Sequence, residues 1–302
     1  MAVRNPSPLI ISAASALMAA ALAAAAPAEA APPKGGTAPA KASAPKAEKA
    51  PTTKAPAKTK LDVPALQKDL ESGDEAKALA ALDTITKSGD PVGATLVEQL
   101  LSRGASVTVL SRAIETLGIL GQPSSGTALA PYAQHRTPEL RRAALRALVA
   151  TKAPNAGDVL RRALHGSDAS QRAIAARGLG ELNVRAAVPE LFSVLPKDVA
   201  EAAQSLGMLC VADECEKLVG FLGKLRFEVM ESAIVPLLLR PQADASDELK
   251  LRLIERLRRM ATAPANQLLQ TALAKFPPDG SPKVKQGIER ALKGYSVSEE
   301  AP

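Results

Sequence analysis

The chain has 302 residues and a formal net charge of +7, from 38 lysines and arginines against 31 acidic residues. Seven lysines and one glutamate lie in residues 31–60, and Arg4 and Glu29 cancel each other before them. Residues 61–302 therefore keep 30 basic and 29 acidic residues. Because a nucleic-acid-binding domain normally carries its own basic face, this nearly neutral region argues against that class of protein.

Residues 1–30 have the pattern of a secretory signal peptide. Arg4 supplies the positive start, residues 9–26 form an uncharged apolar run, and Ala28 and Ala30 fit an Ala-x-Ala cleavage site. We predict cleavage after Ala30 and a periplasmic or secreted protein. The alternative is an uncleaved inner-membrane anchor through residues 9–26, a run just long enough to span a bilayer.

Residues 31–60 consist mainly of Ala, Pro, Lys and Thr. A segment of this composition has too little apolar surface to bury against the entropy cost of ordering it. We predict a disordered linker, extended by its prolines and by repulsion between its lysines. Its lysines are a candidate contact for an anionic envelope polymer or lipid surface.

An internal repeat organises the rest of the chain. The final apolar anchors of successive second helices are spaced 32, 31, 31 and 27 residues apart, at Ile85, Leu117, Leu148, Leu179 and Leu206. Anchors in the preceding helices are spaced 32, 32, 31 and 27 residues apart, at Leu100, Tyr132, Leu164, Leu195 and Leu222. Apolar residues at helical spacing, separated by Gly, Pro and Asp, predict helix pairs without a β-sheet. Two independent series with one period are typical of a helical-repeat protein.

Segments 137–148 and 168–180 resemble the bacterial short HEAT repeats, also called PBS-lyase HEAT-like repeats. Each combines a polar or acidic turn, an early arginine and Ala-rich packing that ends in leucine. The resemblance is clear over about residues 90–222. It implies an all-α fold, a right-handed α-solenoid of about six to seven HEAT-like helical hairpins. It implies no single activity, since most members of the family are interaction scaffolds.

We place the solenoid at residues 61–296 and a disordered tail at residues 297–302. After Arg240 the period drifts, and residues 247–262, 264–275 and 282–294 predict three further helices.

Few residues suggest catalysis. The histidines are His135 and His165, both predicted near turns at the ends of first helices, where a capping or solvent-facing role is usual. With so few metal-binding side chains we expect no zinc site and no cofactor. The even cysteine count in an exported chain suggests a disulfide between Cys210 and Cys215. Two free thiols and a redox pair remain alternatives.

Two arginines occupy the position where HEAT-like repeats place an arginine that links repeats. Arg141 and Arg172 each lie seven residues before an anchor leucine. We expect both to be structural, in a ladder to acidic residues such as Asp168.

A row of polar residues lies two positions before the anchors, at Asp83, Glu115, Arg146, Arg177 and Gln204. If the second helices line the concave face, as in the family, this row points outward and changes from acidic to basic. We predict a strip suited to a protein partner or an acidic peptide. Ordinary solvated charge is the alternative.

Residues 247–262 predict the most basic helix of the domain. Its candidate partner-binding residues are Lys250, Arg252, Arg256 and Arg259. The apolar stripe opposite them predicts a packed helix with a basic outer face. Contact with anionic lipid, cell-wall polymer or DNA is the alternative.

Taken with the predicted export, these patterns favour a non-enzymatic scaffold of the cell envelope that binds a protein on its concave face. A HEAT-like enzyme, similar to a bilin lyase or a DNA glycosylase, is one alternative. Polyanion binding through the basic linker alone is another.

Overall fold

The computed structural model describes residues 61–299, and no β-strand occurs in that range. The predicted signal peptide and linker, residues 1–30 and 31–60, lie outside the described residues. No helix of the described range combines the length and apolar character needed to cross a bilayer. The region is an all-α solenoid, as the sequence predicts.

Helices alternate between two layers along the chain. The outer layer contains α1 (Val63–Glu71), α3 (Val92–Arg103), η1 (Pro123–Ser125), α5 (Gly126–Leu129), η2 (Ala130–Gln134), α7 (Ala156–Ala163), η3 (Arg185–Ala187), α9 (Val188–Val194), η4 (Leu195–Lys197), α11 (Asp213–Val219) and α13 (Asp247–Met260). The inner layer contains α2 (Glu75–Ser88), α4 (Val107–Leu120), α6 (Pro138–Thr151), α8 (Ala169–Glu181), α10 (Ala200–Leu209), α12 (Phe227–Leu238) and α14 (Ala263–Ala274). The described part of the chain thus forms seven helix pairs.

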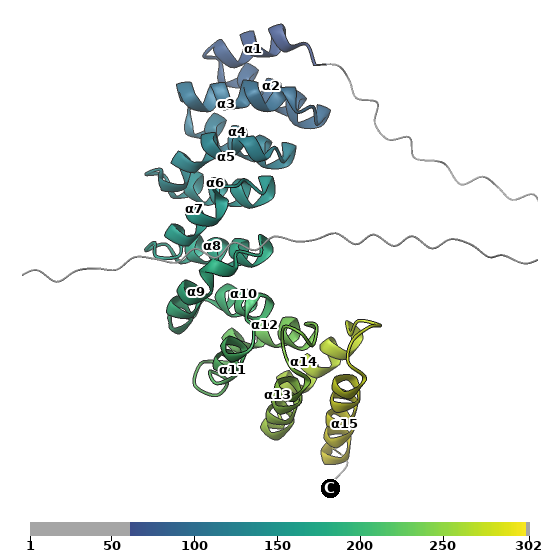
Figure 1. The fold of residues 1–302 in the computed structure, drawn as a ribbon. Coiled ribbons are helices and arrows are strands. Elements are labelled where there is room, and N and C mark those ends of the chain that lie inside the picture. The colour runs from purple at the N-terminus through teal and green to yellow at the C-terminus, as the bar shows by residue number, and fades with distance from the viewer. Residues whose placement is uncertain (1–60, 300–302) are drawn as a thin grey trace, which may run out of the picture. The chain divides into compact units, whose positions relative to one another are not determined.

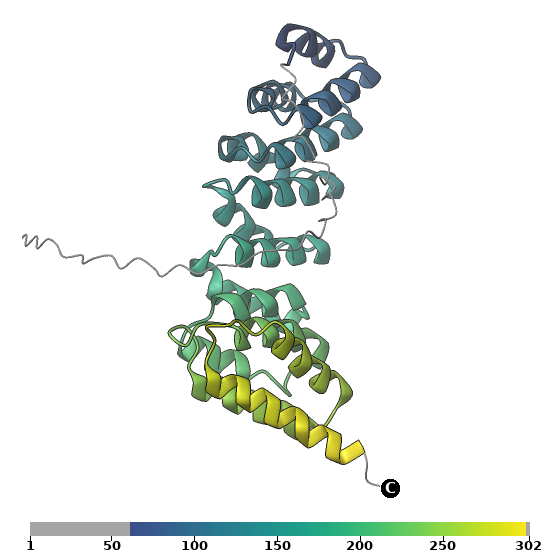
Figure 2. The ribbon, with the colours of Figure 1, turned by 90° about the vertical axis from the view of Figure 1, so that its right-hand side faces the viewer.

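Each inner helix packs on the inner helix of the next pair, from α2 through to α14. Figure 1 shows the pairs following one another in chain order, with the inner helices on the side toward which the stack curves. A final long helix, α15 (Pro282–Glu299), packs against both α13 and α14 and closes the stack. Figure 2 shows α15 at the end of the stack of helix pairs. A helix pair cannot bury its apolar stripe alone, so each pair depends on its neighbours.

The predicted anchors form the core. Ile85, Leu117, Leu148, Leu179 and Leu206 are each 0% exposed. Full burial of a leucine side chain contributes about 1.5–3 kcal/mol relative to leaving it in water. The repeat period therefore follows from one buried residue recurring at the same place in each inner helix.

Turn residues set the helix ends. Asp168 accepts hydrogen bonds from the N–H groups of Ser170 and Gln171 and so caps α8. Gly89 and Gly121 end α2 and α4 in the left-handed region, with φ of 62° and 64°. Thr137 precedes α6 and makes no side-chain capping bond.

Small residues let inner helices approach closely at two junctions. A Cβ on Gly180 would lie 2.4 Å from Ser205 Oγ, and Ser205 itself donates to the carbonyl of Ala176 at 2.8 Å. A Cβ on Gly207 would lie 2.5 Å from the carbonyl oxygen of Ala233. Only glycine fits these contacts without a shift of the neighbouring helix.

The helical region extends beyond the predicted end of the solenoid at residue 296. Helix α15 continues to Glu299. No proline or glycine stands between Gly294 and Glu299, so no residue in that interval breaks the helix.

Candidate functional site

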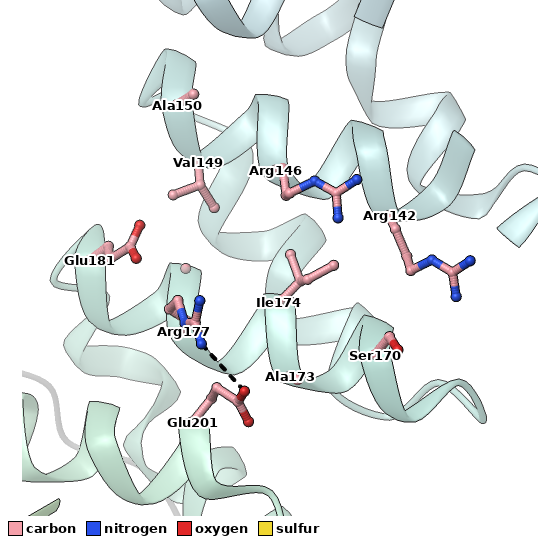
Figure 3. Close-up of a pocket in the computed structure, with 11 residues that line it drawn as sticks. Arg142, Arg146, Val149, Ala150, Ser170, Ala173, Ile174, Arg177, Glu181 and Glu201 are labelled. Carbon is pink, nitrogen blue, oxygen red and sulfur yellow. Dashed lines mark hydrogen bonds and ion pairs between the residues drawn. The ribbon is translucent and has the colours of Figure 1, made fainter. Parts of the chain in front are cut away.

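The inner layer carries a groove of about 680 Å³ between α6 and α8 that reaches α10. We call it the arginine groove, and Figure 3 shows the residues that line it. They are Arg142, Arg146, Val149, Ala150, Ser170, Ala173, Ile174, Arg177, Gly178, Glu181 and Glu201. Two members of the predicted row, Arg146 and Arg177, therefore meet in one depression.

The three arginines differ in how far they are neutralised. Arg142 pairs with Asp168 at 3.2 Å and with Glu139 at 3.3 Å. Arg177 reaches Glu201 at 3.4 Å and keeps 58% of its side chain exposed. Within residues 61–299, exposed Arg146 has no ion-pair or hydrogen-bond partner for its guanidinium. The groove therefore holds one free cation and one weakly paired cation.

The floor of the groove is apolar. Val149 and Ile174 are half-buried and line it between the arginines. A Cβ on Gly178 would lie 2.4 Å from Val149 Cγ2, so glycine at this position brings α8 close to α6. Partly covered aliphatic carbon beside cations suits a ligand that has both an apolar and an anionic group.

The acidic end of the row is not free, which corrects the predicted gradient from acidic to basic. Arg112 donates to Asp83 through Nε at 2.9 Å and also lies 3.6 Å from Glu115. The bond to Asp83 is the main cause that raises the pKa of Arg112. Arg112 lies one helical turn before Glu115 on α4, so helical spacing brings its guanidinium beside that carboxylate.

A second groove of about 640 Å³ lies farther along the inner layer, between α10, α12 and α14. We call it the neutral groove. It contains Gln204, the last member of the predicted row. The residues around Gln204 are Glu231, Ser232, Val235, Pro236, Leu239, Pro264, Gln267, Leu268, Thr271 and Lys275. With one acid and one base among them, this groove carries no formal net charge.

Arg141 and Arg172 contact the turn before their own helix. Arg141 donates to the carbonyls of His135 and Arg136 at 2.8 and 3.0 Å and to Gln171 of the next repeat at 3.2 Å. Arg172 donates to the carbonyls of Gly166 and Ser167, both at 2.9 Å.

The ion pair to Asp168 is therefore made by Arg142 and not by Arg141, contrary to the expected ladder. Neighbouring helix positions point about 100° apart, and this rotation sends Arg141 to the turn and Arg142 across to the next repeat.

The predicted basic outer face is wrong at Lys250. This residue is 2% exposed and its ammonium donates to the carbonyl of Arg240. Burial, as the main cause, lowers the pKa of Lys250. Arg256 is exposed, as predicted, but it donates to the carbonyls of Val219 and Leu222 at 3.0 and 2.9 Å. These carbonyls lie just after α12 and at the end of α11, so both side chains bind backbone at helix ends.

The other two residues of that helix are exposed but paired. Arg252 contacts Glu216 and Glu248. Arg259 pairs with Glu255 at 2.9 Å, and bonds from Arg258 and Arg259 lower the pKa of that carboxyl to about 2. Their charge is largely compensated on α13 and its neighbour α11, so this helix is a weaker candidate site than the arginine groove.

The two cysteines are joined in the structure. Cys210 and Cys215 have their Cα atoms 5.1 Å apart and both side chains are fully buried. The bond connects the end of α10 to the start of α11 across Ala212, whose φ is 41°. A left-handed alanine is uncommon, so this turn is held by the contacts around it.

The first histidine takes part in the turn before α6. His135 Nδ1 accepts from the N–H of Thr137 at 3.1 Å, and its ring stacks on Tyr132. His165 is exposed after the end of α7. Among residues 61–299 there is no cluster of three His, Cys, Asp or Glu side chains able to hold a metal ion.

Some lining residues of the arginine groove were not singled out from the sequence. Arg142 lies one helical turn before Arg146, and Val149 and Ile174 lie within one turn of the row. Helical spacing alone places these three beside the row. Glu201 was not identifiable in this way, because the angle between α8 and α10 brings it to Arg177.

The family model of HEAT repeats matches residues 94–172, and no match was found among curated proteins. Several solved structures are similar. The complex of CpcE and CpcF of phycocyanin lyase from Nostoc sp. PCC7120 is 16% identical with a TM-score of 0.45, and the alignment covers 83% of this chain and 100% of that chain. Human deoxyhypusine hydroxylase is 16% identical with a TM-score of 0.37, over 78% of this chain and 96% of that chain.

An engineered protein is 20% identical with a TM-score of 0.44, over 78% of this chain and 68% of that chain. No activity or partner follows from likenesses at this level. The matched segment, α3 to the start of α8, lies within the stack of helix pairs whose anchors recur at one period. Residues 94–172 of this all-α solenoid are therefore HEAT repeats.

Proposed function

We propose that this chain is a non-enzymatic scaffold of the cell envelope that binds a protein partner on the inner layer of its solenoid. One observation carries the proposal. Several basic side chains elsewhere hold the fold together, as Arg141, Arg172 and Arg256 do by donating to backbone carbonyls. The side chain of Arg146 lies in a groove of the inner layer and makes no such bond among the described residues.

The inner layer suits a protein ligand in its dimensions. Seven parallel inner helices present a continuous surface, and two grooves of about 680 and 640 Å³ lie along it. Extended surfaces of this kind are what helical-repeat proteins use for binding.

The location in the envelope rests on two features. Residues 1–30 carry the signal pattern, and Cys210 and Cys215 form a buried disulfide. Disulfides persist in oxidising compartments such as the bacterial periplasm and are rare in the cytosol. The two features are independent of each other and favour the same side of the membrane.

Site-directed photo-crosslinking tests the binding surface. A photo-reactive residue replaces Ala150 in the arginine groove or, as the matched control, exposed Arg162 on α7 of the outer layer. We expect a discrete crosslinked protein from position 150 and none from position 162. Crosslinks from both positions alike, or from the outer one alone, would reject the inner layer as the binding surface.

The location has its own test, which is independent of binding. Mass spectrometry of the protein recovered from fractionated cells is expected to give an N-terminus at Ala31 in the envelope or secreted fraction. An intact Met1 in the cytosolic fraction would contradict export.

A further inference from the structure

We propose that the arginine groove recognises a short extended peptide whose centre holds one or two carboxylates beside an aliphatic side chain, and that it rejects continuous polyanions. The inference rests on the proposed function, because it specifies which partner segment the inner layer binds.

The attraction for a carboxylate comes from Arg146 and Arg177. Arg146 has no partner for its guanidinium among the described residues, and Arg177 is held by Glu201 at 3.4 Å. A guanidinium and a carboxylate form two parallel hydrogen bonds at about 2.7–2.9 Å. A ligand carboxylate can therefore accept two hydrogen bonds from the guanidinium of Arg146 without breaking any bond of the fold.

The need for an aliphatic neighbour comes from the floor. Half-buried Val149 and Ile174 lie between the two arginines and face the groove. A side chain that covers them removes apolar surface from water, at about 25 cal/mol per Å². Aspartate or glutamate two residues from leucine, isoleucine or valine supplies both groups on one side of an extended segment, since successive side chains of such a segment point to opposite sides.

Polyanions are disfavoured by the acids on either side of the arginines. Glu181 and Glu201 line the groove itself. Exposed charges repel one another over about 8 Å, the screening length at physiological salt, so these carboxylates disfavour negative charge placed beyond the centre of the groove. The flanks of the ligand must therefore be neutral or basic, which a nucleic acid or a sulfated polysaccharide cannot provide.

The groove also limits the length of the segment. It extends from α6 across α8 to α10, which is two helix spacings of about 8–10 Å each. An extended chain advances about 3.3 Å per residue. About five or six residues therefore fill the groove, with the carboxylates in the middle.

A random twelve-residue peptide library displayed on phage, selected in parallel on the full-length chain and on its Arg146→Glu variant, tests the charge pattern. Selection on the parent chain is expected to enrich a central Asp or Glu two residues from an aliphatic residue. The Arg146→Glu variant is expected to lose these sequences and to favour a central Lys or Arg. Arg162→Glu, on the outer layer, should leave the parent selection unchanged.

Binding of the best enriched peptide, followed by fluorescence anisotropy, gives the magnitude. Arg146→Gln should weaken binding about tenfold, the loss expected for one charge-assisted bond, while the thermal melt stays that of the parent. Arg162→Gln should bind as the parent does. Heparin and single-stranded DNA should not displace the peptide at physiological salt.

Three outcomes would overturn the inference. Enriched peptides without an acid, the same enrichment on Arg146→Glu, or displacement by heparin would each remove it. In the first two cases, photo-crosslinking from Ala150 still decides separately whether the inner layer binds a protein. Failure to enrich any peptide, together with absent crosslinks, would remove the proposed function as well.

Discussion

The arginine groove and the neutral groove have nearly the same size, about 680 and 640 Å³, yet they differ in chemistry. Both are formed by neighbouring inner helices whose buried faces are alike. They differ at the positions that point outward, where α6 and α8 carry Arg146 and Arg177 and α12 carries Val235 and Pro236. The buried positions of this solenoid therefore determine how its helices stack, while the exposed positions can vary and determine what it binds.

The neutral groove also shows where the repeat becomes irregular. Pro236 lies inside α12 and cannot donate a helical hydrogen bond. The pairs after it end in α15, which packs on both α13 and α14. The regular repeats, α1 to α10, carry the arginine groove and are followed by a closing unit, α11 to α15, with its own packing. Variants in each region test how independent the two regions are.

The largest expected effect is on the regular repeats. Leu179 on α8 is 0% exposed, so Leu179→Ala should lower the free energy of unfolding by about 2–5 kcal/mol. Urea melts followed by circular dichroism at 222 nm measure it. If the regular repeats and the closing unit unfold together, the urea unfolding curve of the variant should still show one transition.

The control for Leu179→Ala is Ile119→Ala. Ile119 is 61% exposed, and its replacement should cost less than about 0.5 kcal/mol. Leu251 is not a suitable control, because it is half-buried against α15, where a Cβ on Gly287 would lie 2.6 Å from its Cδ2. Equal losses for Leu179→Ala and Ile119→Ala would contradict the assignment of buried and exposed positions.

The disulfide joins the last regular inner helix to the closing region. Cys215→Ala opens a loop with a sequence separation of 5, and the chain-entropy relation gives a loss of about 2 kcal/mol. The expected result is a lower urea midpoint for the variant, and an equal shift for the parent chain in reducing agent. If reductant lowers the variant's midpoint as well, the effect does not come from this bond.

The junction between α10 and α12 sets how closely the two regions approach. Gly207→Ala places a methyl group 2.5 Å from the Ala233 carbonyl oxygen, and such overpacking costs about 1–3 kcal/mol. The gain in helix propensity, about 1 kcal/mol, partly offsets the loss. Gly118→Ala is the matched substitution on α4, where the nearest atom is Ala147 Cα at 3.3 Å. It should be tolerated better in the same melts.

One pH dependence should come from Lys250 in the closing unit. Burial lowers the pKa of Lys250, with Arg240 adding to the effect and Asp247 and Asp244 opposing it. Because the unfolded chain keeps the ordinary value of 10.5, it binds more protons than the folded chain between the two pKa values. The free energy of unfolding should therefore rise with pH in that window, by at most about 1.4 kcal/mol per pH unit.

Lys250→Met removes this titrating group and should abolish its share of the rise. Urea melts of parent and variant from pH 7 to pH 10.5 measure the difference, so that other lysines and tyrosines cancel. Identical slopes for the two proteins would show that Lys250 keeps its ordinary pKa in the folded state.

The sequence by itself determined the class of fold, since a buried leucine or isoleucine every 31 or 32 residues recurs as Ile85, Leu117, Leu148 and Leu179. It also determined that Arg146 and Arg177 share one face, because an equivalent position in each repeat points the same way. These features depend on local spacing and on repetition, which a sequence displays directly.

Only the tertiary structure decided how each charge is used. Arg112 neutralises Asp83 from the next repeat, Lys250 turns inward to a carbonyl, and Arg256 reaches the end of α11, although all three are basic residues on amphipathic helices. Their partners lie 10 to 37 residues away in sequence, at distances fixed by the angles between helices. Those angles result from packing between helices. The sequence therefore shows where Arg146 lies on its helix, and only the packed structure shows that no neighbouring side chain pairs with it.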